Sequence, residues 1–151
     1  SATGGGISAH DVFMTDSTLA DSSAVAVSGS GYARGGGVAA TDVALERSTV
    51  SGNLVKNYFG DYTEGGGIYV SGDLTLDSSS ISDNTATGPG GSDSVSTGGG
   101  IYRSEGPEAI LIENTTIDHN QADKGGGLYF QAPQALAVAG VAQGTIRPST
   151  I

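Results

Sequence analysis

Apolar residues recur along the chain in an order that repeats about every 30 residues. Each repeat holds two apolar residues separated by one other residue. Four of the five repeats add a single aliphatic residue five positions after the second of them. The alternating pairs are Val12/Met14, Val43/Leu45, Leu74/Leu76, Ile110/Ile112 and Leu136/Val138, and the single aliphatic residues are Leu19, Val50, Ile81 and Ile117. Alternation with a period of two is typical of strands. Each repeat is therefore predicted to contain three short strands. One begins after the glycine triplet described in the next paragraph, one contains the alternating pair and one contains the single aliphatic residue.

Glycine triplets divide the repeats. Gly-Gly-Gly followed by an aliphatic residue begins at Gly4, Gly35, Gly65, Gly98 and Gly125. The three middle repeats carry an asparagine three positions after the single aliphatic residue, at Asn53, Asn84 and Asn120. Ser22 and Gly144 are taken as its counterparts in the first and last repeats. Glycine and asparagine tolerate left-handed backbone, so turns are expected at both places. The glycines lead into strands rather than a helix, which disfavours a phosphate-binding loop.

Short strands separated by turns at this period predict an all-β fold, a parallel β-helix of about five rungs. Equivalent residues of successive rungs should stack about 4.8 Å apart. Aliphatic ladders would fill the interior, and Asn53, Asn84 and Asn120 would form a structural ladder at one turn. Residues 1–151 are interpreted as one domain, with residues 139–151 as a divergent last rung or cap.

Two elements of the repeat resemble a known group of proteins. Gly66-Gly67-Ile68 is followed by Ile81-Ser82-Asp83-Asn84, and Gly99-Gly100-Ile101 by Ile117-Asp118-His119-Asn120. These pairs are similar to the repeats of polymorphic outer-membrane proteins and of other right-handed parallel β-helix proteins on bacterial surfaces, including passenger segments of autotransporters. The resemblance implies a right-handed helix, an extracellular or cell-surface location and a role as an adhesin or passenger module. It implies no catalytic residue.

Composition narrows the set of partners. Sixteen acidic residues against six basic ones give a net charge of −10, which disfavours nucleic acid and anionic membranes as ligands. The chain has no cysteine, and none of its apolar runs approaches the ~20 residues that span a bilayer. We expect the chain to be part of a longer solenoid, whose open rung is able to associate end to end with a second copy.

Three tyrosines are the leading candidates for ligand binding. Tyr69, Tyr102 and Tyr129 each follow the aliphatic residue after a glycine triplet. Alternation should turn them outward as a stacked aromatic strip that suits a glycan or a host or cell-surface protein. The alternative is that the tyrosines only stabilise the sheet. Three longer segments that precede the next triplets, residues 23–34, 54–64 and 85–97, are interpreted as insertions projecting from one edge, where solenoids often place recognition loops.

Acidic residues suggest two further sites. Glu46, Asp77 and Glu113 should stack on consecutive rungs, and such a ladder suits either full solvation, the favoured interpretation, or a Ca²⁺ ion. Arg47 lies beside Glu46, and Arg47 with Asp77 is the cluster to test for lyase chemistry.

The sequence therefore favours a non-catalytic extracellular solenoid that displays the tyrosine strip and the insertions to a glycan or protein. The alternatives are part of a polysaccharide lyase or glycoside hydrolase of β-helix fold, and a structural spacer.

Overall fold

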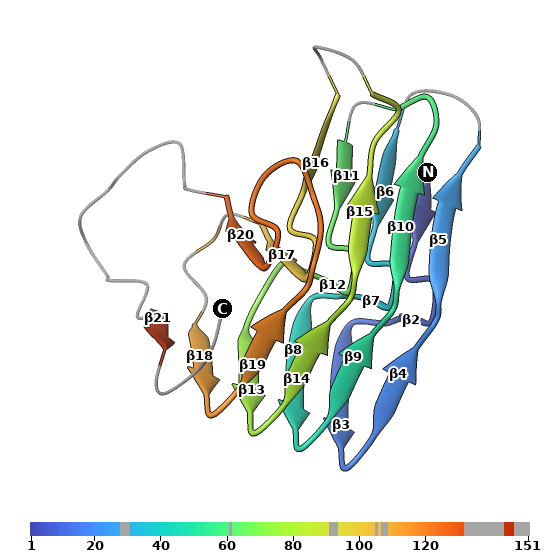
Figure 1. The fold of residues 1–151 in the computed structure, drawn as a ribbon. Coiled ribbons are helices and arrows are strands. Elements are labelled where there is room, and N and C mark those ends of the chain that lie inside the picture. Colours follow the sequence, from blue (N-terminus) through green and yellow to red (C-terminus); the bar gives the residue numbers. More distant parts are fainter. Residues whose placement is uncertain are drawn as a thin grey trace.

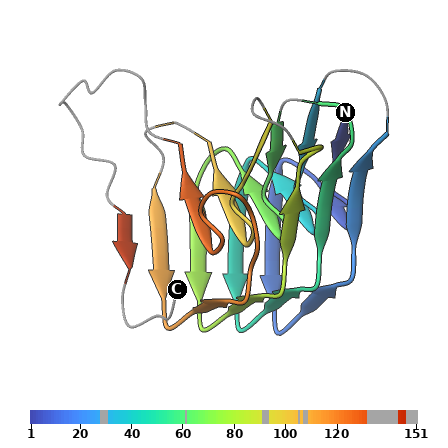
Figure 2. The same cartoon turned by 45° about the horizontal axis from the view of Figure 1, so that its top comes forward.

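The described strands pair in parallel with strands roughly one repeat away, so the chain winds as a β-helix of about four turns (Figures 1 and 2). The computed structural model describes residues 1–27, 31–60, 62–90, 94–104, 106, 109–131 and 144–146. The predicted all-β parallel solenoid is confirmed, with about four coils where the sequence suggested five. We call one circuit of the chain a coil.

A complete coil contributes one strand to each of five parallel sheets. Sheet A contains β1 (Ala2–Thr3), β6 (Tyr32–Arg34), β11 (Tyr62–Glu64) and β16 (Val95–Thr97). Sheet B contains β2 (Ile7–Ser8), β7 (Val38–Ala40), β12 (Ile68–Val70), β17 (Ile101–Arg103) and β20 (Leu128–Phe130). Sheet C contains β3 (Asp11–Thr15), β8 (Asp42–Glu46), β13 (Leu74–Asp77), β18 (Ile110–Glu113) and β21 (Gly144–Ile146). Sheet D contains β4 (Thr18–Ala20), β9 (Thr49–Ser51), β14 (Ser80–Ser82) and β19 (Thr116–Asp118). Sheet E contains β5 (Ser23–Ala26), β10 (Leu54–Asn57) and β15 (Thr85–Thr87).

The prediction of three strands per coil is wrong, because the three segments interpreted as projecting insertions are part of the coil. Residues 23–34 contain β5 and β6. Residues 54–64 contain β10 and β11, and residues 85–97 contain β15 and β16. These strands form sheets A and E, the upper part of Figure 1. β10 is followed by a turn at Tyr58–Gly60, which Asn57 holds by accepting hydrogen bonds from the N–H groups of Phe59 and Gly60.

The interior is divided into two cores. Sheets B, C and D enclose a large aliphatic core that contains the predicted ladders, and sheets A and E enclose a small core made mainly of alanine. The fully buried large side chains belong to the large core, except Val55 in the small one; they are Val38, Val43, Leu45, Val50, Val55, Ile68, Leu74, Leu76, Ile81, Ile101, Ile112 and Ile117. We call the two parts the large lobe and the small lobe. Alanine fills the small lobe because its two sheets leave little space between them.

The glycine triplets and the asparagines face each other at a waist between the lobes. A Cβ on the second glycine of a triplet would collide with the next coil, since at Gly66 it would lie 2.1 Å from the carbonyl oxygen of Gly99. A Cβ on the third glycine would press on the opposite asparagine, as at Gly67, where it would lie 2.9 Å from Cγ of Asn84. The first glycine takes a left-handed conformation, with φ of 70° at Gly65. The triplet is therefore required by the narrowness of the waist.

The predicted asparagine ladder is present. The side-chain oxygen of Asn84 accepts hydrogen bonds from the backbone N–H and the Nδ2 of Asn53, at 3.0 and 2.9 Å, and Asn120 receives the same pair from Asn84 at 3.0 and 2.9 Å. The expectation that asparagine itself takes the left-handed turn is wrong. That conformation belongs to the preceding residue, with φ of 57° at Asp83 and 53° at His119.

The end of the chain departs from the predicted register. Gly144 and Ile146 of β21 pair with Ile110 and Ile112, so they occupy the positions predicted for Leu136 and Val138, and Gly144 is not the counterpart of the asparagines. Leu136, Val138 and Val141 lie outside the described residues, as does most of the proposed cap at 139–151. One coil earlier, residues 121–124 cross directly from sheet E to sheet A through isolated bridges of Gln121 with Thr85 and Lys124 with Thr97.

Candidate binding groove

A groove runs along the outside of the waist, where sheets A and B meet at the glycine triplets. Two pockets of about 250 and 310 Å³ lie in it, and outward side chains of both sheets line each of them. The narrow waist draws the two sheets together on the inside, and this leaves a concave outer surface between the lobes. We call this surface the outer groove.

Three columns of side chains line the outer groove, each with one residue per coil. On the sheet A side the column contains Tyr32, Tyr62 and Val95. At the bottom a polar column occupies the position immediately before each glycine triplet and contains Thr3, Arg34, Glu64, Thr97 and Lys124. On the sheet B side the column contains Ser8, Ala39, Tyr69, Tyr102 and Tyr129.

The tyrosines of the sheet B column stack on one another. Ring centroids of Tyr69 and Tyr102 lie 5.5 Å apart with planes 9° apart, and those of Tyr102 and Tyr129 lie 5.6 Å apart at 8°. Across the groove Tyr32 and Tyr62 stack at 5.2 Å and 16°. The three tyrosines stack as the sequence predicts, but Tyr102 is only 4 % exposed because its neighbours in the stack and the concave corner cover it.

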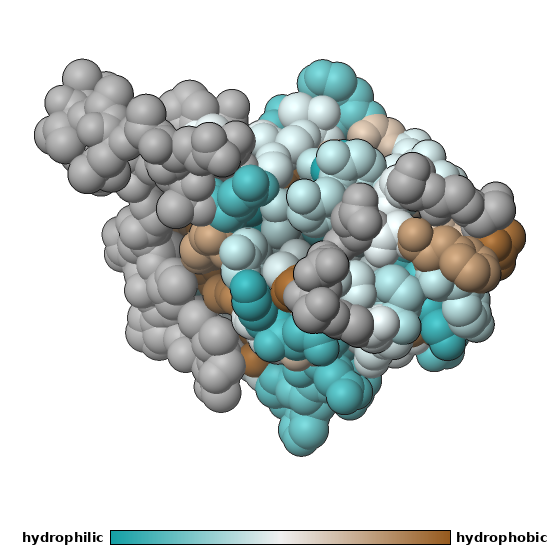
Figure 3. All heavy atoms as spheres, turned by 90° about the horizontal axis from the view of Figure 1, so that it is seen from above, coloured by the Kyte–Doolittle hydropathy of each residue, from teal (hydrophilic) through white to brown (hydrophobic). Residues whose placement is uncertain are grey.

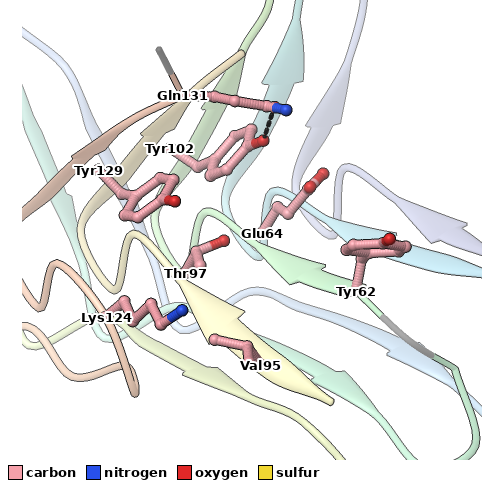
Figure 4. Close-up of a pocket in the computed structure, with 8 residues that line it drawn as sticks. All are labelled: Tyr62, Glu64, Val95, Thr97, Tyr102, Lys124, Tyr129 and Gln131. Atoms are coloured by element: carbon pink, nitrogen blue, oxygen red, sulfur yellow. Dashed lines mark hydrogen bonds between the residues drawn. The ribbon is translucent and has the colours of Figure 1, made fainter. Parts of the chain in front are cut away.

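Tyr102 is held from the groove side as well. Its hydroxyl donates a hydrogen bond to Oε1 of Gln131 (Figure 4). Burial, and secondly the negative charge of Glu64, raise the pKa of this hydroxyl, which therefore stays protonated at neutral pH. Tyr102 packs between its neighbours, and in the pocket that it lines the tyrosines with more exposed surface are Tyr62 and Tyr129.

An ion pair in the polar column separates the two pockets. Nε of Arg34 lies 2.7 Å from Oε2 of Glu64, and the side chains are 29 % and 7 % exposed. The guanidinium also lies over the rings of Tyr32 and Tyr69, at 4.1 and 4.7 Å from their centroids. Burial lowers the pKa of Arg34, but the contact with Glu64 outweighs this effect and the pKa is raised. Arg34 is therefore held as a cation and is paired with the carboxyl group of Glu64.

The pocket on the C-terminal side of this ion pair is polar at its base and aromatic on its walls. Figure 4 shows Tyr102 and Tyr129 on one side and Tyr62 on the other, with Glu64 and Thr97 between them and Lys124 at one end. Glu64 is the one carboxylate among the described residues that line the two pockets. Hydrolysis of a glycoside by acid–base catalysis requires two carboxyl groups on either side of the bond, and the described part of the groove does not bring two together.

The side-chain contacts of Arg47 and Asp77, the cluster suggested for lyase chemistry, lie on opposite sides of Glu46 in the stack of coils. Nε and Nη2 of Arg47 bind the carboxylate of Asp16 at 2.7 and 2.8 Å, and Nη1 contacts Glu46. The hydrogen bonds from Arg47 lower the pKa of Asp16. Arg47 is thus engaged with the preceding coil, whereas Asp77 accepts a hydrogen bond from Ser78 at 2.9 Å.

The acidic ladder has the predicted register, since Asp77 pairs with Glu46 on one side and Glu113 on the other. Its three carboxylates do not come close enough to share an ion. Within the described ranges, the three potential ligand groups whose atoms lie within 4.8 Å of one another are His10, Asp11 and Asp42, all at the surface. The Ca²⁺ site at the ladder stays a prediction.

Sequence reasoning found one wall of the groove and missed the rest. Arg34, Glu64 and Lys124 share the position directly before a glycine triplet, and this constant position was the available signal. Tyr62 lies in the segment 54–64, which the sequence pattern presents as an insertion, whereas it forms the opposite wall of the groove.

Comparisons with known proteins add no assignment: no protein-family model, no curated protein and no solved structure matches this chain significantly. Within the described ranges no helical segment has the length and hydropathy that crossing a membrane requires. Seen from above, the described surface is mostly hydrophilic or neutral, with hydrophobic residues in small separate areas (Figure 3).

Proposed function

We propose that this protein is a non-catalytic module of an extracellular or bacterial-surface solenoid, and that its outer groove binds a glycan chain. The observation that carries the proposal is the groove itself, which runs along the rod between two columns of aromatic side chains. Concave sites with aromatic walls and a few polar groups at the base are the usual form of small-molecule and glycan sites.

The chemistry of the lining suits sugars. Tyrosine offers an apolar ring to the C–H face of a sugar and a hydroxyl to its oxygens. Thr97 and Gln131 add further polar groups beside Tyr129. Tyrosines recur on three successive coils of the sheet B column, at Tyr69, Tyr102 and Tyr129, so an elongated glycan that lies along the rod would meet a tyrosine wall over that length.

Binding without turnover is favoured over the polysaccharide-degrading alternative by the state of Glu64. A general acid or base has to exchange its proton with the substrate, and this carboxylate is 5 % exposed and paired with Arg34. The extracellular location rests on the resemblance of the repeats to bacterial-surface solenoids.

The test is affinity electrophoresis and calorimetry with soluble cellulose and dextran, each as a neutral, a carboxymethylated and a sulfated polymer. Wild type should bind at least one polymer, and Tyr62→Ala and Tyr129→Ala should each weaken binding about five- to tenfold, the size of one lost aromatic contact. Phe13→Ala is the matched control, because Phe13 is an aromatic residue that is 78 % exposed on the outer face of sheet C.

Absence of binding to every polymer, or an equal loss in Phe13→Ala, would contradict the proposal. Product analysis on the same samples addresses the alternative. Shortened chains or new unsaturated ends would identify an enzyme instead.

A further inference from the structure

The charge of the outer groove is opposite to that of the protein. The chain carries sixteen acidic and six basic residues. Among the described residues that line the two pockets, the basic ones are Arg34 and Lys124 and the acidic one is Glu64. The protein is strongly acidic, yet the described residues that line the two pockets of the outer groove carry one more basic than acidic side chain.

Lys124 carries that excess. Arg34 and Glu64 neutralise each other, whereas no salt bridge joins Lys124 to another described side chain. Its backbone is fixed on both sides, since its N–H donates to the carbonyl of Ser96 at 3.1 Å and its carbonyl accepts from the N–H of Gly98 at 3.0 Å. The side chain lies at the end of the pocket that Thr97 and Tyr129 also line (Figure 4).

We propose that this end of the groove takes the anionic substituent, a carboxylate or a sulfate, of an acidic glycan. The ammonium group of Lys124 pairs with the anion, and the hydroxyls of Thr97 and Tyr129 donate hydrogen bonds to it or to neighbouring sugar oxygens. This inference rests on the proposed function and specifies the class of glycan.

An acidic peptide carries the same charge, but the groove fits it less well. Extended peptides commonly bind by adding a strand to the free edge of a sheet. The groove presents the faces of sheets A and B, and the strands that line it at Tyr62 and Tyr102 are already paired on both sides.

The experiment compares the neutral, carboxymethylated and sulfated forms of cellulose and dextran on the full chain. The salt concentration is set to about 0.15 M, where charges more than ~8 Å from the groove are largely screened. Wild type should bind an anionic form more tightly than the neutral form of the same polymer. Lys124→Gln should weaken binding of the anionic form about fivefold and leave the neutral form unchanged.

Lys56→Gln is the matched control, because Lys56 lies on sheet E with its ammonium 4.5 Å from the ring centroid of Tyr58. A preference for carboxymethyl or for sulfate polymers supports the inference and identifies the anion. Equal affinity for neutral and anionic forms, or an equal loss in both lysine variants, overturns the inference while the proposed function stands. Absence of binding to every polymer defeats both. Tighter binding of poly-glutamate, lost in Lys124→Gln, overturns the assignment to a glycan.

Discussion

Asn84 provides the strongest test of how the coils are held together. Its side chain is completely buried and makes four hydrogen bonds. The oxygen accepts from the N–H and Nδ2 of Asn53, and the amide nitrogen donates to the carbonyl of Val50 at 3.0 Å and to Oδ1 of Asn120 at 2.9 Å. Replacement by alanine removes all four bonds at the waist.

The expected loss follows from what the substitution leaves unpaired. The N–H of Asn53 loses its acceptor in a residue that is 1 % exposed, and an unsatisfied buried donor is unfavourable by about 1–3 kcal/mol. The other three hydrogen bonds contribute about 1 kcal/mol each. Asn84→Ala should therefore lower the free energy of unfolding by about 4–6 kcal/mol, a large part of the stability of an ordinary domain.

Urea denaturation measures this loss. With a slope of about 2 kcal/mol per molar urea, the midpoint should fall by about 2–3 M. The chain has no tryptophan, so unfolding is followed by tyrosine fluorescence and far-ultraviolet circular dichroism. A fall below about 1 kcal/mol, the size of an average substitution, would refute the role given to the ladder.

Asn84→Asp separates hydrogen bonding from packing. The new carboxylate keeps one acceptor towards Asn53 but turns its second oxygen to the carbonyl of Val50 and to Oδ1 of Asn120, both acceptors. Burial and these oxygens raise the pKa of the new group in the folded state, so the variant should lose stability relative to wild type as pH rises from about 4 to 7. Asn114→Asp is the control: Asn114 is exposed, with φ of 50°, and Asp16 takes the same conformation in the first coil. A similar pH dependence in Asn114→Asp would show that the effect does not come from the waist.

Two further predictions test the waist and the end of the small lobe. Gly66→Ala should lower stability by about 2–4 kcal/mol in thermal unfolding because its Cβ meets the Gly99 carbonyl, whereas Gly88→Ala, with the nearest atom at 3.7 Å, should stay within about 0.5 kcal/mol; equal effects would contradict the packing argument. Asp123 accepts hydrogen bonds from the N–H and hydroxyl of Ser96 at 2.9 and 2.8 Å, and these lower the pKa of its carboxyl group below 3.8. The stabilisation is therefore present at neutral pH and lost as pH falls through the lower folded pKa, so the difference in urea midpoint between wild type and Asp123→Ala should be largest near pH 7 and narrow as pH falls below 3.8; a constant difference would contradict the assignment.

The large lobe was predictable because its inward positions carry large aliphatic residues at constant spacing. Ile81 and Ile117, for example, stack in register as their position in the repeat requires. The small lobe was not recognised because its inward residues include Ala24, Ala33 and Ala86, which give no hydrophobic period. Thin lobes require small side chains, and small side chains carry a weak signal.

The last repeat and the groove were missed for different reasons. The spacing of Leu136 and Val138 imitates the strand pattern, whereas β21 begins with a glycine and shows only Ile146 as a large apolar residue. In the polar column chemically unlike residues such as Arg34 and Glu64 share one position, so a search for similar residues does not find them. Both errors arise where position in the coil, rather than residue type, defines the role.

The short crossing at residues 121–124 shows how independently the two lobes are built. Here the chain bypasses almost the whole small lobe, Ala122 packs against the end of its core, and the next triplet still enters sheet B in register. A deletion or insertion at this place would thus change the sheet A wall of the outer groove without disturbing the stacking of the coils. Such a design lets evolution vary the length of a recognition surface while conserving the scaffold that carries it.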